Sequence, residues 1–185
     1  MNIGVILARF QPIHNGHLAL IKKAMNENDK VIILIGSSDK INERNPIPWT
    51  FRLELVKKAI NELNLRRQCI EIHCLPDLTD ESDNSHDWGF YLYSKIVSIT
   101  QQSNFSMYYS DGFEIITSWF PGFILSNNVS LCLLARNATE SGISATKIRN
   151  MILSDDSNLE SVVPKCVYSK KHIIKSFIEV YNSKY

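Results

Sequence analysis

The chain has 185 residues and almost balanced charge, with 20 Lys and Arg residues against 19 Asp and Glu residues and a formal net charge of +1. This balance argues against a partner held by bulk positive charge, so we expect no nucleic-acid partner. The hydrophobic fraction of 44% is enough for a core and excludes a disordered or collagen-like chain. The length is that of one domain, so we expect a single domain over 1–185, with about 150–185 as its helical C-terminal part.

Neither a signal-peptide pattern nor a run of about 18 apolar residues is visible, so we expect a cytoplasmic protein without a membrane partner. The four cysteines show no Cys-x-x-Cys pair and no zinc-type spacing, which indicates reduced thiols. Cys74 and Cys132 lie in apolar runs, and we expect both to be core residues.

Apolar runs alternate with amphipathic segments along the chain. The pattern predicts a strand at 2–8, a helix through 18–25, a strand at 31–35, a helix from Thr50 to 63 and a strand at 69–75. After an acidic loop, it predicts a helix at 88–99, a strand at 105–109, a short helix at 113–120, a strand at 129–134 and only helices beyond Ser144.

This alternation predicts an α/β fold, a doubly wound five-stranded parallel sheet with right-handed crossovers, helices on both faces and C-terminal helices. Ligands bind such sheets at the carboxyl ends of the strands, where the strand order reverses. We therefore expect the functional site at that edge.

The first predicted strand leads into Arg9-Phe10-Gln11-Pro12-Ile13-His14-Asn15-Gly16-His17, where a loop begins a helix. His14 and His17 are three residues apart, so both imidazoles can face an anion at the helix N-terminus. Gly16 would let a phosphate approach the backbone. Ordinary surface or core histidines and a metal site are the alternatives, but no third metal ligand is visible nearby. Arg9, the histidines and Gly16 together favour a phosphate site.

A second loop begins a helix at Gly142-Ile143-Ser144-Ala145-Thr146-Lys147-Ile148-Arg149. Ser144 suits an N-cap, and the hydroxyls of Ser144 and Thr146 with the first-turn amides would form a second anion cradle. Arg149, about one turn further on, adds a fork that matches phosphate oxygens. A plain capping sequence with a solvated arginine is the alternative. Two such helix starts in one sheet favour phosphate binding.

Both segments resemble signatures of the nucleotidyltransferases, His-x-Gly-His at 14–17 and Ile-Ser-x-Thr-x-Ile-Arg at 143–149. The chain is most similar to the archaeal-type nicotinamide mononucleotide adenylyltransferases. Their Gly-Arg-Phe-Gln-Pro-Phe-His-x-Gly-His opening corresponds to 8–17, with Ala8 in place of glycine, and their Ile-Gly-Ser strand end to 35–37. Their Asn-Pro-Phe-Thr-x-x-Glu-Arg segment resembles 45–52, where Trp49-Thr50-Phe51 differs. The similarity extends to Pro76-Asp77, Trp88, Tyr109-Ser110 and Val163-Pro164.

The resemblance implies a Rossmann-like nucleotidyltransferase fold and the transfer of AMP from ATP to the 5′-phosphate of nicotinamide mononucleotide, which gives NAD and pyrophosphate. Catalysis would consist of in-line positioning and charge stabilisation. Catalytic donors would be Arg9, His14, His17 and Arg149. The ATP-binding residues would be Arg9, Phe10, Gln11, His14, Gly16, His17, Ser144, Thr146 and Arg149. A Mg²⁺ ion would be held mainly by the ATP phosphates, without protein ligands.

For the acceptor, the resemblance implies that Trp88 stacks on the nicotinamide ring, Asp77 accepts a hydrogen bond from its amide or ribose, and Arg52 pairs with its phosphate, with Ser37 beside them. Trp88 follows a polar loop and begins a helix, so we expect its indole to be covered only when ligand binds. The loop from Asp77 to Trp88 is longer than in the family. Its acidic residues Asp80, Glu81, Asp83 and Asp87 are predicted to form a solvated loop, with ordering on substrate binding as the alternative, and their roles stay open.

The resemblance also implies a homo-oligomer. Three alternatives stay open: nicotinate mononucleotide as acceptor, another phosphorylated small molecule as acceptor, and a non-catalytic nucleotide-sensing protein of the same fold. Intact His14, His17 and Arg149 argue against the sensing protein, because a pure sensor has little need for donors around the α-phosphate.

Overall fold

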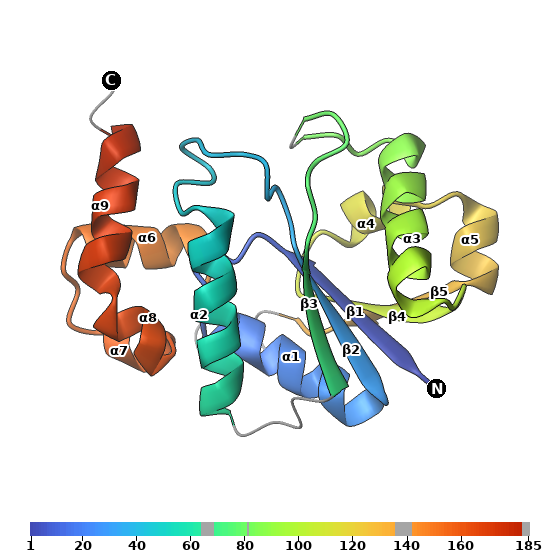
Figure 1. Ribbon diagram of the computed structural model, residues 1–185, viewed down its shortest axis with the longest axis horizontal. Coiled ribbons are helices and arrows are strands. Elements are labelled where there is room, and N and C mark those ends of the chain that lie inside the picture. The colour runs from blue at the N-terminus through green and yellow to red at the C-terminus, as the bar shows by residue number, and fades with distance from the viewer. Residues whose placement is uncertain (64–68, 81, 136–141, 183–185) are drawn as a thin grey trace.

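The computed structural model describes residues 1–63, 69–80, 82–135 and 142–182, which form an α/β architecture (Figure 1). Its parallel sheet consists of β1 (Ile3–Ala8), β2 (Lys30–Ile35), β3 (Ile70–Cys74), β4 (Phe105–Tyr109) and β5 (Val129–Leu133), in the order β3-β2-β1-β4-β5. The order reverses between β1 and β4. The predicted doubly wound sheet is therefore confirmed, and its crevice lies at the carboxyl ends of these two strands.

Helices cover both faces of the sheet. The helices α1 (Asn15–Glu27) and α2 (Trp49–Glu62) pack on one face, and α3 (His86–Thr100), α4 (Phe113–Trp119) and α5 (Gly122–Asn127) pack on the other. Successive strand side chains point to opposite faces, so Ile6 joins the first core while Val5 joins the second. The sequence did not predict α5, a helix of 6 residues that begins after Pro121 and is too short for a clear apolar period.

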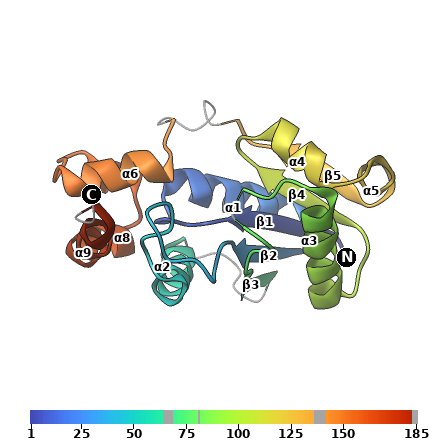
Figure 2. The same ribbon diagram turned by 90° about the horizontal axis from the view of Figure 1, so that it is seen from above.

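The chain ends in a group of helices, α6 (Ala145–Leu153), α7 (Leu159–Val162), α8 (Lys165–Ser169) and α9 (Lys171–Asn182). They lie beside α2, at the end of the molecule away from α3 (Figures 1 and 2). Ile148, Val167 and Ile174 extend the same core that α1 and α2 form against the sheet. This packing holds the start of α6 close to the loop that follows β1, which brings the two predicted phosphate-binding segments together.

The four cysteines are free thiols. Cys166 is buried and Cys132 is half-buried, but Cys74 is exposed, so the expectation of a core role is wrong for Cys74. The reason is topological, because Cys74 ends β3, which is an edge strand. Within the described ranges, the helices are all too short or too polar to span a membrane.

Candidate active site

Two cavities occur at the carboxyl edge of the sheet, and Arg9 lines both. The tryptophan cavity has a volume of about 190 Å³ and is lined by Leu7, Ala8, Arg9, Gly36, Ser37, Asp77, Asp80, Asp83, Asn84, Trp88 and Trp119. The histidine cavity has a volume of about 240 Å³ and is lined by Arg9, Phe10, His14, His17, Ser110, Ile143, Ser144 and Ala145. The histidine cavity lies between the ends of β1 and β4, where the strand order reverses, as the fold predicts.

The two histidines lie at the start of α1 with their rings stacked, the centroids 3.8 Å apart and the planes at 30°. The backbone N–H of His14 donates to Nδ1 of His17 at 3.3 Å. Because Nδ1 uses its lone pair as an acceptor, a neutral His17 carries its proton on Nε2, which is then a donor. His14 is 5% exposed and lies behind it. The sequence-predicted pair is therefore brought together at one helix N-terminus.

Gly16 lies between these histidines. A Cβ atom built there would be 3.1 Å from Cε1 and Nδ1 of the His14 ring, closer than almost all real contacts of that kind. The glycine therefore leaves room for the His14 imidazole, whereas the sequence suggested room for a phosphate.

Phe10 and Gln11 are buried beneath the histidine cavity. Phe10 has a left-handed backbone with φ of 51°, and its ring centroid is 4.8 Å from that of His17. The Gln11 amide forms two hydrogen bonds with the backbone of Ile47, donating to its oxygen at 3.1 Å and accepting from its nitrogen at 3.0 Å. The ATP contacts expected of these two residues stay predictions. Gln11 holds the loop around residue 47, and Phe10 supports His17.

The other side of the histidine cavity is the start of α6. Ser144 is its N-cap, as predicted, and its Oγ accepts from the Lys147 backbone nitrogen at 3.2 Å. Arg149 donates to the Gln11 carbonyl at 3.0 Å and to the Thr146 hydroxyl at 3.3 Å. Its guanidinium therefore ties α6 to the loop after β1. Burial and then the neighbouring positive charge of Arg9 lower the pKa of Arg149.

Arg52, for which the resemblance implied a contact with the acceptor phosphate, is fully buried. Its guanidinium donates to three backbone carbonyls, those of Arg9 at 2.6 Å, Gly36 at 2.8 Å and Ser37 at 3.1 Å. Burial lowers the pKa of Arg52 to about 10, and the charge of Arg9 adds to this effect. Arg52 thus joins the loops that follow β1 and β2 from below.

Asp77 and Ser37 face each other across the loops that follow β3 and β2. The Ser37 hydroxyl donates to Oδ1 of Asp77 at 3.1 Å, and Ser37 has a left-handed backbone with φ of 46°. The other oxygen, Oδ2, is buried and has no hydrogen-bond partner among the described residues. Burial raises the pKa of Asp77, although the Ser37 bond opposes this. Asp77 therefore has unused acceptor capacity at the tryptophan cavity.

The Trp88 indole is 7% exposed without any ligand, so the expectation that only ligand would cover it is wrong. It packs against Tyr91 and meets Trp119 edge to face, with centroids 6.2 Å apart. Trp119, at the end of α4, is the more exposed of the two indoles and lines the same cavity. The Trp119 Nε1 donates to Oδ1 of Asn84 at 3.0 Å.

Several lining residues were not predicted as site residues: Ser110, Asp80, Asp83, Asn84 and Trp119. Ser110 had a usable signal, because it directly follows β4 and a polar residue there belongs to the ligand-binding edge. Trp119 had none, since its position depends on how α4 packs against α3. Glu81 of the acidic loop lies outside the described residues.

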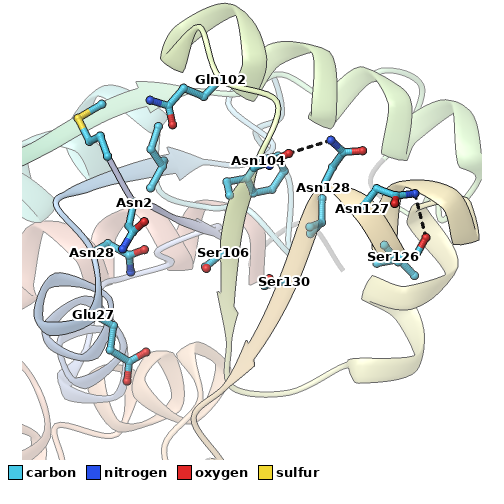
Figure 3. A pocket seen from close by; sticks show the side chains of 15 residues that line it. Asn2, Glu27, Asn28, Gln102, Asn104, Ser106, Ser126, Asn127, Asn128 and Ser130 are labelled. Atoms are coloured by element: carbon cyan, nitrogen blue, oxygen red, sulfur yellow. Dashed lines mark hydrogen bonds between the residues drawn. The ribbon is translucent and has the colours of Figure 1, made fainter.

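A larger cavity, of about 570 Å³, lies at the opposite edge of the sheet, where β1, β4 and β5 begin (Figure 3). Its walls consist mainly of amides and hydroxyls, and one of its hydrogen bonds joins Asn128 to Asn104 at 2.9 Å. Of the described residues that line it, none is Lys, Arg or His. Its size alone therefore does not indicate a phosphate site, whereas Arg9, His14 and His17 line a cavity at the carboxyl edge.

In the part of the chain that the structure describes, no three His, Cys, Asp or Glu side chains gather in a way that could hold a metal ion. The histidine cavity instead combines Arg9, the two imidazoles at the start of α1, the Ser144 hydroxyl at the start of α6 and the Ser110 hydroxyl after β4. These are donors, which suit the oxygens of a phosphate group.

Comparison with known proteins agrees with this chemistry. The model of the family described as cytidylyltransferase-like matches residues 5–151. The nicotinamide-nucleotide adenylyltransferase of Thermococcus sibiricus is 28% identical over 170 residues, which cover 89% of this chain and 80% of that protein. The enzyme of the same name from Saccharolobus solfataricus is 26% identical over 189 residues, covering 95% and 91% of the two chains.

Solved structures also share the fold. A bifunctional NMN adenylyltransferase/ADP ribose pyrophosphatase from Francisella tularensis, complexed with AMP and a manganese ion, superposes with a TM-score of 0.72 at 20% identity. The match covers 98% of this chain and 51% of that one, so this chain spans about half of the bifunctional protein. The Plasmodium falciparum nicotinic acid mononucleotide adenylyltransferase complexed with NaAD has a TM-score of 0.61 at 14% identity, covering 98% and 96%.

Proposed function

The chain belongs to the cytidylyltransferase-like family, and from this premise we propose that it transfers AMP from ATP to the 5′-phosphate of nicotinamide mononucleotide, releasing NAD and pyrophosphate. Curated relatives over most of the chain are nicotinamide-nucleotide adenylyltransferases, which supports this reaction. The product is a dinucleotide, so the site must hold two phosphate groups side by side.

The observation that carries the proposal is the position of Arg9 between the two cavities. ATP phosphates in the histidine cavity and the mononucleotide in the tryptophan cavity would meet at this one guanidinium. Both reacting phosphates are anions and repel each other, and a shared cation reduces that repulsion while it aligns them. Neither cavity alone would need a residue in that position.

The acceptor phosphate is already a nucleophile, so the reaction needs no covalent enzyme intermediate. Its oxygen attacks the α-phosphorus of ATP, and the bond to pyrophosphate breaks. In this proposal the Nε2–H of His17 donates to an α-phosphate oxygen, and His14 holds the His17 ring through stacking and through its backbone N–H. Arg9 and Arg149 stabilise the charge on the α-phosphate and on the leaving pyrophosphate, and Ser144 with the first amides of α6 binds the triphosphate.

We further propose Mg²⁺ as the metal. The lining of the histidine cavity contains hydroxyls and cationic side chains but no described carboxylate, which fits an ion that ATP phosphates and water hold. When bound with ATP, the ion would neutralise phosphate charge and help pyrophosphate to leave.

The test is incubation of the protein with ATP, Mg²⁺ and a panel of phosphorylated acceptors, with pyrophosphate release and dinucleotide formation as readouts. Nicotinamide mononucleotide is expected to give NAD and an equal amount of pyrophosphate. His172→Ala, an exposed histidine of α9, is the matched control for substitution of His17. ATP binding without transfer to any acceptor would favour the nucleotide-sensing alternative, and transfer to a non-pyridine phosphate would overturn the acceptor assignment.

A further inference from the structure

The tryptophan cavity has two chemically different ends. Arg9 marks the end that it shares with the histidine cavity, where the acceptor phosphate belongs. Away from Arg9, the lining residues belong to the long acidic loop and to the helices that follow it, Asp80, Asp83, Asn84, Trp88 and Trp119. If the phosphate lies against Arg9, the base of the acceptor lies against this second set.

The second end carries negative charge. Hydrogen bonds from Ser82 lower the pKa of Asp80, and those from Ser85 and then Thr79 lower the pKa of Asp83, so both are ionised at neutral pH. Asp77 lines the same cavity with its buried Oδ2, which has no hydrogen-bond partner among the described residues. Three carboxylates therefore surround the place of the base.

The cations near this end are already engaged. Lys40 forms an ion pair with Asp39 at 3.0 Å and contacts the Thr79 carbonyl at 3.5 Å. Arg52 lies fully buried beneath the loops, with its guanidinium on three backbone carbonyls. Arg9 is at the phosphate end. The balance at the base end is thus negative.

Two indole rings also favour a positively charged ligand at this end of the cavity. Trp88 and Trp119 meet at an angle of 85°, and the Trp119 Nε1 is held by Asn84. Indole faces attract cations through the negative face of the ring. Carboxylates and indole rings together form a lining that suits a positively charged ring.

On the basis of the proposed function, we propose that this end of the cavity selects the acceptor by the net positive charge of its base, the ring together with its substituent. Nicotinamide mononucleotide has a pyridinium ring with a neutral carboxamide. Nicotinate mononucleotide adds a carboxylate, which Asp77, Asp80 and Asp83 repel, and reduced nicotinamide mononucleotide has an uncharged ring. The fold does not make this choice, since similar structures include both nicotinamide and nicotinic acid enzymes.

The test is calorimetric titration of the three mononucleotides into the wild-type protein and into the double variant Asp80→Asn, Asp83→Asn. Wild type is expected to bind nicotinamide mononucleotide at least about tenfold more tightly than either analogue, which corresponds to one unit of charge at a partly exposed site. The affinity for nicotinamide mononucleotide relative to each analogue gives two ratios. Both should fall by roughly 3- to 10-fold in the double variant and should also shrink at high salt. Asn keeps one acceptor oxygen at each position, which at Asp83 can serve only one of the two loop hydrogen bonds, so the melting temperature checks the fold.

The control is Glu160→Gln, Glu179→Gln, which removes the same charge from exposed positions on the C-terminal helices and should leave both ratios unchanged. Equal affinities for all three compounds in wild type would overturn the inference. Affinity ratios that change neither in the double variant nor at high salt would overturn it as well. Binding is measured directly, so these outcomes are separate from the proposed function, which is tested by AMP transfer to the panel of acceptors.

Discussion

Substitution of Arg52 by methionine distinguishes two roles for this residue. One is a contact with the acceptor phosphate, which the family resemblance implied, and the other is the joining of two loops. In the structure the guanidinium joins the loops after β1 and β2 by donating to the carbonyls of Arg9, Gly36 and Ser37. Met fills much of the same volume without donors, so the variant removes the three hydrogen bonds that Arg52 donates. Ser37, with its left-handed backbone, then loses a contact that holds a strained conformation.

The size of the effect follows from these bonds. Hydrogen bonds to a charged group contribute about 1.5–3 kcal/mol each, so three of them contribute roughly 5–9 kcal/mol before opposing costs. Burial of the guanidinium, which lowers the pKa of Arg52 to about 10, offsets part of this contribution. We expect a net loss of about 3 kcal/mol in the free energy of unfolding. For a chain of this length, that loss lowers the melting temperature by about 6–12 °C.

Calorimetric melting and separate titrations of ATP and nicotinamide mononucleotide provide the assay. Loosened loops should weaken both ligands, since Arg9 lines both cavities. Arg52→Lys should be intermediate, because an ammonium cannot reproduce the planar fork. Lys57→Met, on the exposed side of the same helix, should change stability by less than about 0.5 kcal/mol. An unchanged melting temperature with selective loss of mononucleotide affinity would refute the role of Arg52 in joining the loops. It would instead support a direct contact between Arg52 and the acceptor phosphate.

Three further substitutions test the site. His17→Ala should lower kcat by about 10²–10³ with little change in ATP affinity, because it removes a donor to the transition state, and comparable turnover would leave His17 a structural role only. Trp88→Ala should destabilise the fold by about 3–5 kcal/mol, since the indole is buried against Tyr91 and Trp119, and an unchanged denaturant midpoint would contradict this packing. Asp77→Asn should weaken mononucleotide binding yet stabilise the fold at pH 7. Burial raises the pKa of Asp77, so its ionised form costs stability above that pKa, whereas below the ordinary value of 3.8 both states are protonated and the cost vanishes. The stability difference measured by denaturant melts should therefore shrink on acidification, and a constant difference would contradict the titration.

The local sequence pattern was sufficient to predict the strands of this fold. The strand at 105–109 was predicted at its observed bounds, and the others within one residue at each end, because buried parallel strands are continuous apolar runs with polar breaks. The N-cap role of Ser144 was equally readable, since a cap depends on residues within one turn. The meeting of the two helix starts followed from topology, because carboxyl ends of parallel strands share one edge.

Other features depend on contacts between distant residues, and no local pattern encodes these. Arg52 has the sequence context of an exposed helical arginine, but its partners are carbonyls that precede it by 15 to 43 positions. Trp88 is covered by Trp119, from a helix beyond the next strand. Gly16 has the context of a phosphate-binding glycine, yet the nearest atoms to an added Cβ are those of the His14 ring.

On the acceptor side of the site, three residues carry backbone strain, an unpaired polar atom or a buried charge. Asp77 keeps a buried oxygen without a hydrogen-bond partner among the described residues, Ser37 has a left-handed backbone, and Arg52 retains a buried charge beneath both loops. Each of these features costs folding free energy, so substitutions that relieve them at Asp77 or Ser37 can stabilise the protein. The histidine side also carries backbone strain, at Phe10, although Ser144 caps its helix there and a backbone hydrogen bond joins the stacked histidines. Stability and activity should therefore oppose each other at the tryptophan cavity, where stabilising variants are expected to lose acceptor affinity first.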